Sequence, residues 1–293
     1  MFAGTYTALV TPFHKGRVDE GAFQKLISDQ VRGGVDGIVP VGTTGESPTL
    51  GFDEHIRVIE LAVRAAKGRV KVLAGTGANA TAEAVHLTQA AEAVGADGSL
   101  QVAPYYNKPS QEGVFQHFKK IARATRLPII LYSIPGRCNI AIEVPTVQRL
   151  AKACKNIVGI KEAGGDADRV SQLRAAIGQR FTILSGDDAL TLPFMAVGAE
   201  GVISVASNII PRQITRMVNA FTAGNADAAL RLHQKYYSMF KALFIETNPV
   251  PTKAALAMLG KCTEESRLPL CKMSAGNRAQ LAKTLKACGV LKK

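Results

Sequence analysis

The chain has 293 residues, of which 47% are hydrophobic and 20% are charged, so it is long enough and apolar enough to bury one large core or two small ones. The net charge of +13 raises the question of nucleic-acid binding. The basic residues are scattered, however, and form neither a stripe interleaved with aromatic residues nor a zinc-finger spacing. A basic surface that attracts anionic metabolites is therefore favoured. Five cysteines without a CxxC pair argue against a disulfide framework, and no apolar stretch approaches the length of a membrane helix, so we expect a cytoplasmic protein that binds neither membrane nor nucleic acid.

Short β-rich runs alternate with helical patterns over most of the chain. The expected strands are Tyr6–Val10, Gly37–Val41, Val70–Gly75, Gly98–Ala103, Pro128–Tyr132, Ile157–Lys161, Phe181–Ser185 and Gly201–Val205. Most are nearly continuous in apolar or small residues, as parallel strands covered on both faces should be. Between them lie helical spacings such as Phe23, Leu26 and Ile27. Eight strands in alternation with helices predict an α/β fold, a closed (β/α)8 TIM barrel.

The rival architecture is an open doubly wound sheet, which shows the same local alternation. Such a sheet usually begins with a Gly-rich phosphate turn, whereas the first strand here runs into Thr11-Pro12-Phe13. A closed barrel is therefore favoured, and we expect it to occupy residues 1–224. Helical patterns follow to the end, so residues 225–293 are expected to form a small helical extension packed on the barrel, without a linker that would make it an independent domain.

The chemistry of such a barrel lies just past the strand ends. After the second expected strand stands Gly42-Thr43-Thr44-Gly45-Glu46-Ser47, where two glycines and two threonine hydroxyls suit a carboxylate or a phosphate. The same residues could instead form a simple turn with a helix cap. The fourth and fifth strands both place tyrosine at the mouth, where phenol hydroxyls can relay protons, although a rim tyrosine more often serves packing.

Lys161 ends the sixth expected strand, Ile157–Lys161. Its side chain points either into the barrel or into the layer between strand and helix. In either buried position desolvation disfavours the ammonium and leaves a nucleophilic amine, the group that Schiff-base chemistry needs. The alternative is a strand-end lysine whose ammonium reaches solvent. No histidine or cysteine cluster has metal-ligand spacing, and we expect no cofactor and no metal.

Taken together, several segments resemble the dihydrodipicolinate synthase (4-hydroxy-tetrahydrodipicolinate synthase) family within the pyruvate-dependent class I aldolases. They are GTTGES (42–47), GTGAN (75–79), PYYNKPSQEG (104–113), YSIPGR (132–137), GIKEAGG (159–165), LSGDD (184–188) and GVISV (201–205). The resemblance covers essentially the whole chain in the family's order and spacing. It implies a lyase that condenses pyruvate with L-aspartate-4-semialdehyde in the diaminopimelate and lysine pathway.

The resemblance also implies roles for individual residues. Lys161 would form an imine with pyruvate and then an enamine that attacks the aldehyde, while Thr43, Tyr106 and Tyr132 match the family's hydroxyl relay. In that family the counterpart of Tyr106 comes from a neighbouring subunit, so a homo-oligomer is expected, a tetramer built as a dimer of dimers. The substrate-binding positions implied by the resemblance are Thr44, Arg137, Gly186 and Ile203.

Two other functions are compatible with part of this set of residues. The 2-keto-3-deoxy sugar-acid aldolases and N-acetylneuraminate lyases share Lys161, Tyr132 and the threonine loop, but Arg137 and the Tyr105-Tyr106 pair favour the synthase. A non-enzymatic sensor of 2-oxo acids is disfavoured, because it would have little need of a hydroxyl relay.

Family members from many bacteria and plants are inhibited by L-lysine at a cleft in the dimer interface. The matching positions are Ser47, Pro48, Phe52, His55, Asn79, Glu83 and Tyr105. Asn79 and Glu83, the groups expected to hold the charged ends of lysine, are retained, whereas Phe52 replaces a common histidine and Pro48 a small residue. The resemblance therefore implies that L-lysine binds here and inhibits.

Overall fold

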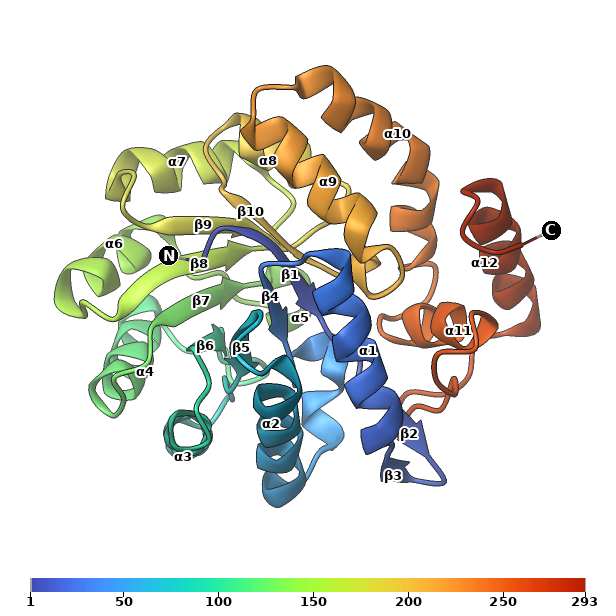
Figure 1. Cartoon of the computed structure of the whole chain (residues 1–293). Coiled ribbons are helices and arrows are strands. Elements are labelled where there is room, and N and C mark those ends of the chain that lie inside the picture. Colours follow the sequence, from blue (N-terminus) through green and yellow to red (C-terminus); the bar gives the residue numbers. More distant parts are fainter. Residues whose placement is uncertain (1, 293) are drawn as a thin grey trace.

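The computed structural model describes residues 2–292 and contains a closed barrel of eight parallel strands (Figure 1). The strands are β1 (Gly4–Ala8), β4 (Gly37–Val39), β5 (Lys71–Gly75), β6 (Gly98–Val102), β7 (Ile129–Ser133), β8 (Ile157–Glu162), β9 (Thr182–Ser185) and β10 (Gly201–Ser204). Neighbours in this series pair side by side, and β10 pairs back with β1 through Gly201 and Gly4. The predicted barrel is therefore confirmed.

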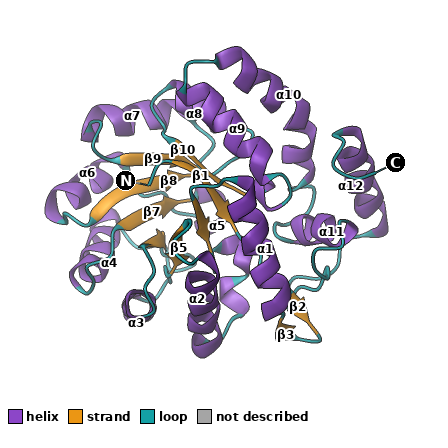
Figure 2. Cartoon of the chain, viewed as in Figure 1, coloured by secondary structure: helices purple, strands orange, loops and turns teal. Residues whose placement is uncertain are grey.

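Helices cover the outside of the barrel (Figure 2). They are α1 (Glu20–Gly33), α2 (Phe52–Ala66), α3 (Thr81–Ala93), α4 (Gln111–Arg123), α5 (Pro135–Cys138), α6 (Val144–Ala153), α7 (Ala167–Ile177), α8 (Thr191–Ala196), α9 (Pro211–Thr222), α10 (Ala226–Ala242), α11 (Val250–Met258) and α12 (Ala275–Ala287). Local sequence explains where they begin and end. In α1, for example, the Asp19 carboxylate accepts the amide hydrogen of Ala22, and Gly34 ends the helix at a φ of 77°.

Several details differ from the sequence-based expectation, among them a short hairpin and the ends of most strands. A small hairpin, β2 (Phe13–His14) and β3 (Arg17–Val18), follows β1 and was not predicted, because two-residue strands carry no periodicity. The first barrel strand also ends at Ala8 and not at Val10. The Val10 amide donates to the Asn208 side chain at 3.2 Å and not to a neighbouring strand.

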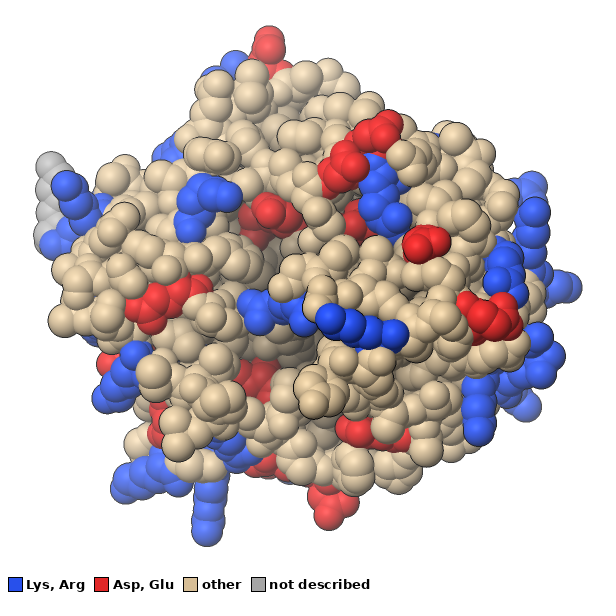
Figure 3. Space-filling view, turned by 180° about the vertical axis from the view of Figure 1, so that it is seen from behind, with Lys and Arg blue, Asp and Glu red and all other residues tan. Residues whose placement is uncertain are grey.

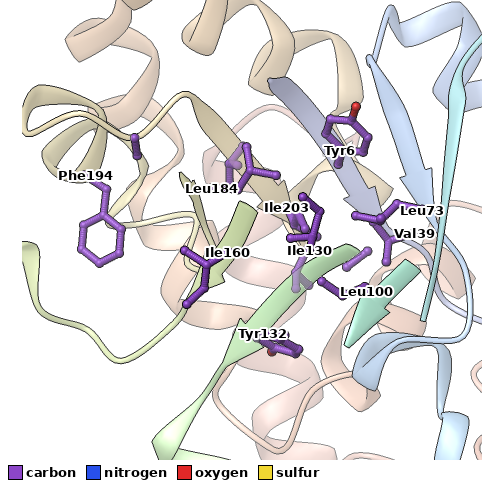
Figure 4. Close-up of a cluster of buried hydrophobic side chains, with 14 of the residues drawn as sticks. Tyr6, Val39, Leu73, Leu100, Ile130, Tyr132, Ile160, Leu184, Phe194 and Ile203 are labelled. Carbon is purple, nitrogen blue, oxygen red and sulfur yellow. The ribbon is translucent and has the colours of Figure 1, made fainter. Parts of the chain in front are cut away.

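The barrel interior is filled by apolar side chains. Figure 4 shows Val39, Leu73, Leu100, Ile130 and Ile203, which come from five different strands, turned toward one another inside the barrel. Because successive residues of a strand face opposite sides, each strand contributes alternate side chains to this packing. The barrel interior is thus a packed core, and we expect a ligand to bind at the carboxyl ends of the strands.

The chain after α9 lies along one side of the barrel, with α12 packed against α10 and α11 (Figure 1). Lys261, just past α11, forms an ion pair with Asp29 of α1 at 2.7 Å. Within residues 2–292, no helix is both long enough and apolar enough to cross a membrane.

Candidate active site

A cavity of about 220 Å³ opens at the carboxyl ends of β4, β5, β6 and β7. Its polar lining comes from Thr43, Ser47, Tyr105, Tyr132 and Arg137, and the rest is mostly apolar or glycine. This volume suits a small metabolite.

In Figure 3, which shows the face opposite to that of Figure 1, basic and acidic side chains alternate around the surface and form no continuous basic stripe.

Lys161 lies next to this cavity with its side chain on the barrel side of β8. It pairs with Tyr132 of β7 in the parallel register, so the two side chains share a face, and its Nζ lies 4.1 Å from the centroid of the Tyr132 ring. The next residue, Glu162, points the other way, into the helix layer, where it accepts a hydrogen bond from Arg169 Nε at 2.7 Å. The Lys161 side chain therefore points into the barrel, which is one of the two directions that the sequence left open.

The environment of Lys161 disfavours its charged form. The residue is 6% exposed, and burial lowers the pKa of its ammonium to about 7, with Asp188 opposing the shift and Arg137 adding to it. Burial also raises the pKa of Asp188 to about 6, although this carboxylate accepts hydrogen bonds from Ser204 Oγ and from the amides of Val205 and Ala206. A substantial fraction of the Lys161 amine is therefore neutral near pH 7.

Gly186 and Ile203, two of the expected substrate-binding residues, occupy different surroundings. A Cβ atom on Gly186 would lie 3.0 Å from Lys161 Cε and 2.6 Å from Ala163 Cβ, so the lack of a side chain leaves room for the lysine. Ile203 is fully buried in β10, with its side chain in the barrel core (Figure 4).

The Thr43–Thr44 loop faces the tyrosine of β7. A hydrogen bond joins the hydroxyls of Thr43 and Tyr132 and lowers the pKa of the phenol, but burial outweighs it and raises that pKa to about 12. The Thr44 hydroxyl turns elsewhere and accepts a hydrogen bond from Asn248 Nδ2 at 2.9 Å. Arg137 donates to the Asn248 carbonyl at 3.2 Å, so Asn248 joins the two predicted substrate-binding residues.

Tyr106 is the predicted site residue that the single chain does not bring to the others. It is 90% exposed, has a positive φ of 75° and lies outside the residues that line the cavity. Its neighbour Tyr105 does line the cavity, so the two tyrosines point in different directions.

Three of the seven residues matched to the lysine cleft line the same cavity. Ser47, Pro48 and Tyr105 line it. Burial and the nearby Glu83 carboxylate raise the pKa of Tyr105, whose phenol is hydrogen-bonded to the Asn79 backbone.

The remaining two matched residues make contacts of their own. His55 Nε2 lies 2.8 Å from the Gly75 carbonyl oxygen, and Phe52 packs edge-on against His86 with ring centroids 6.0 Å apart.

Two residues beside the site were not singled out from the sequence. Asp188 carries a signal that the sequence does offer, an acidic pair with Asp187 directly after an expected strand. Asn248 lies 204 positions from Thr44, and nothing in the local sequence relates the two. The site therefore combines the partly neutral, buried amine of Lys161 with the protonated phenol of Tyr132 and the hydroxyl of Thr43, next to a small cavity. These groups suit a condensation of the amine with a carbonyl compound.

Comparison with known proteins agrees with this chemistry. Residues 1–288 match the model of the dihydrodipicolinate synthetase family. The chain is 52% identical over 292 residues to the 4-hydroxy-tetrahydrodipicolinate synthase of Endomicrobium trichonymphae, covering all of both chains. It superposes with a TM-score of 0.98 and 54% identity on the 4-hydroxy-tetrahydrodipicolinate synthase of Methylacidiphilum fumariolicum SolV, covering 99% of this chain and 96% of that one. With a structure of DHDPS from Cyanidioschyzon merolae that has lysine bound, the TM-score is 0.96 and the identity 43%, over 99% of each chain.

The burial of Lys161 predicts that its replacement by an apolar residue stabilises the fold. At or below pH 7 the wild type places an ammonium in a buried site, whereas above the pKa of an unfolded lysine both states are neutral. Lys161→Met should therefore raise the Tm by roughly 3 °C or more near pH 7, and the gain should shrink as the pH rises toward 10. Thermal unfolding across this pH range measures it. Lys283→Met on the exposed face of α12 serves as the control, and an equal, pH-independent gain in both variants would contradict the assignment.

Proposed function

The chain belongs to the dihydrodipicolinate synthetase family, and we propose that it is a lyase that condenses pyruvate with L-aspartate-4-semialdehyde to give 4-hydroxy-tetrahydrodipicolinate, in diaminopimelate and lysine biosynthesis. The observation that carries this proposal is the Lys161 amine, buried on the barrel side of β8 with its pKa lowered to about 7. Full-length relatives named for the synthase favour it over a sugar-acid aldolase or an N-acetylneuraminate lyase.

The reaction begins at Lys161. Its neutral amine adds to C2 of pyruvate, and loss of water leaves a protonated imine. The imine withdraws electrons, so a C3 proton leaves and an enamine forms. The enamine C3 bonds to the aldehyde carbon of the semialdehyde. The substrate's own amine then attacks C2, which closes the ring and releases the lysine.

The surrounding groups carry protons and hold carboxylates. Tyr132, whose phenol stays protonated at neutral pH and is hydrogen-bonded to Thr43, is placed to pass protons during imine formation. Amide groups of the Thr43–Thr44 loop hold the carboxylate of pyruvate. Arg137, at the rim of the cavity, binds the carboxylate of the semialdehyde. Gly186 and Ile203 provide backbone contacts close to the imine.

Borohydride trapping tests the central step. Incubation with pyruvate and borohydride should attach a reduced adduct to the wild type, and peptide mapping should find it on Lys161. Lys161→Met should give no adduct and no turnover in a coupled assay with L-aspartate-4-semialdehyde. Trapping at another lysine would refute the mechanism. Trapping at Lys161 without turnover of the semialdehyde would refute the substrate assignment and favour a sugar-acid aldolase.

Tyr106 completes the relay from a second subunit in this proposal. Its 90% exposure in the single chain is what a hydroxyl that serves a neighbouring site requires. We propose a homotetramer arranged as a dimer of dimers, in which the dimer is the smallest unit with complete sites. The free cysteines favour a reducing compartment, so we place the enzyme in the cytoplasm.

Complementation between two inactive variants tests this arrangement. Tyr106→Phe and Lys161→Met should each show strongly reduced activity alone. Co-expressed with different tags and purified as mixed dimers, they should regain activity, because one site combines Lys161 of one chain with Tyr106 of the other. Each purified mixed dimer contains one complete site of two, so it should show about half of the wild-type activity. If Tyr106 serves its own chain, the mixed dimers will stay inactive.

L-Lysine is proposed as an inhibitor that binds in the outer part of the cavity. Glu83 and Asn79, grouped around Tyr105, offer a carboxylate for one ammonium and polar groups for the other end of the ligand. The structure of a relative with lysine bound supports the binding of lysine as such. His55 contributes to this site indirectly, because it is hydrogen-bonded to the carbonyl of Gly75, a residue that lines the cavity.

Initial rates test this inhibition. Millimolar L-lysine should lower the wild-type rate, and L-norleucine, which lacks the side-chain ammonium, should not. Glu83→Gln should weaken inhibition about tenfold or more, because the charge-assisted bond is lost. An unchanged rate at 10 mM L-lysine, a value on the order of a weak metabolite Kd, would exclude this regulation.

A further inference from the structure

Glu46 is a buried charged residue at the turn that carries Thr43 and Thr44. It ends the short turn η1 (Thr43–Gly45) and precedes the short turn η2 (Ser47–Thr49). Its φ of 57° lies in the left-handed region, which a residue with a side chain seldom occupies without support from its surroundings. Both turns contribute to the cavity, Thr43 from one and Ser47 with Pro48 from the other.

The support for Glu46 comes from the far end of the chain. Its Oε1 forms an ion pair with Lys253 Nζ of α11, and both side chains are completely buried. This oxygen has no hydrogen bond besides that contact, so without Lys253 it would be a buried charge without a partner. Its Oε2 accepts the amide hydrogen of Arg267 at 3.0 Å.

Lys253 is itself held in one place. Its Nζ donates to the Glu265 carbonyl at 2.8 Å and lies 4.1 Å from the centroid of the Phe13 ring, whose other neighbour is the Arg267 guanidinium at 4.3 Å. Burial lowers the pKa of Lys253, and the charge of Glu46 opposes this. The pair is therefore fixed by contacts with the first hairpin and with the segment after α11.

A buried ion pair is a poor source of net stability, because desolvation of both ions offsets their attraction. Its best-supported effect is to select one arrangement of the groups that carry it. Here one ion lies on the loop of Thr43 and the other on α11. Asn248, which is separated from α11 by Pro249, makes the second link to the same loop through Thr44.

We propose that Lys253 and Glu46 are positioning residues for the condensation, in which the buried pair holds the Thr43–Thr44 loop so that the Thr43 hydroxyl meets Tyr132 and the loop amides meet the carboxylate of pyruvate. This inference rests on the proposed function, since it assigns these two residues to the same site. Neither residue touches the reacting atoms.

Four variants test the pair. Lys253→Met removes one charge, and Glu46→Gln with Lys253→Met removes both. The single variant should lower kcat/KM for pyruvate by about ten- to a hundredfold, with a higher KM and a lower kcat, because a displacement of about 1 Å in a reacting site costs this much. It should also lower the Tm. The double variant should recover the Tm, since no unpaired charge remains, yet keep the low kcat/KM. Lys253→Arg should recover part of both.

The fourth variant is the control, Arg174→Met. Arg174 forms an ion pair with Glu200 at 3.2 Å and bonds to carbonyls at the opposite end of the barrel, so this change should lower the Tm and leave the KM for pyruvate unchanged. The rate of borohydride trapping is measured for every variant at a temperature where each is folded.

The outcomes separate this inference from the proposed function. Failure of the wild type to be trapped would overturn the proposed function. Trapping of the wild type at Lys161, together with wild-type kinetics in the double variant, would overturn only the positioning role. If Lys253→Met does not fold, the double variant still decides, because it buries no unpaired charge.

Discussion

The burial of one amine determines most of what this site requires. Lys161 is buried on the inner side of the barrel, and its ammonium is disfavoured because the surrounding core offers few groups that can replace water. A neutral amine can attack a ketone, so the same desolvation that costs folding free energy supplies the nucleophile of the proposed reaction. Asp188 limits the effect, since its charge favours the ammonium. Burial and Asp188 thus act in opposite directions, and burial, the larger effect, lowers the pKa of the amine to about 7.

Much of this fold could be predicted because barrel strands are so regular. Near-continuous apolar runs at even spacing indicated eight parallel strands, and the positions at or just past their ends indicated Thr43, Tyr132 and Lys161. The direction of the Lys161 side chain could not be predicted, because a strand buried on both faces shows no alternation of polar and apolar residues. The pairing with Tyr132 and the opposite direction of Glu162 decide it.

Contacts between distant segments were beyond the reach of the sequence. Asn248 and Lys253 resemble ordinary residues at the start of a helix, and only the folded chain shows that they reach Thr44 and Glu46. The hairpin at Phe13 is likewise too short to show a pattern, although its ring lies against two cations. The helices after the barrel therefore do more than cover its surface, since α11 and the residues before it contact the loop to which the proposed chemistry assigns the carboxylate of pyruvate.

Gly186 limits how the substrate range of this barrel can change. Any side chain there would meet Lys161 Cε and Ala163 Cβ before it met a ligand, so this side of the amine has no freedom to vary. The apolar lining of the cavity includes Leu100, Val102 and Ile134, whose exchange alters its shape without adding charge. Divergence toward larger or differently shaped aldehydes has to proceed through those apolar residues, while the lysine and its glycine neighbour stay as they are.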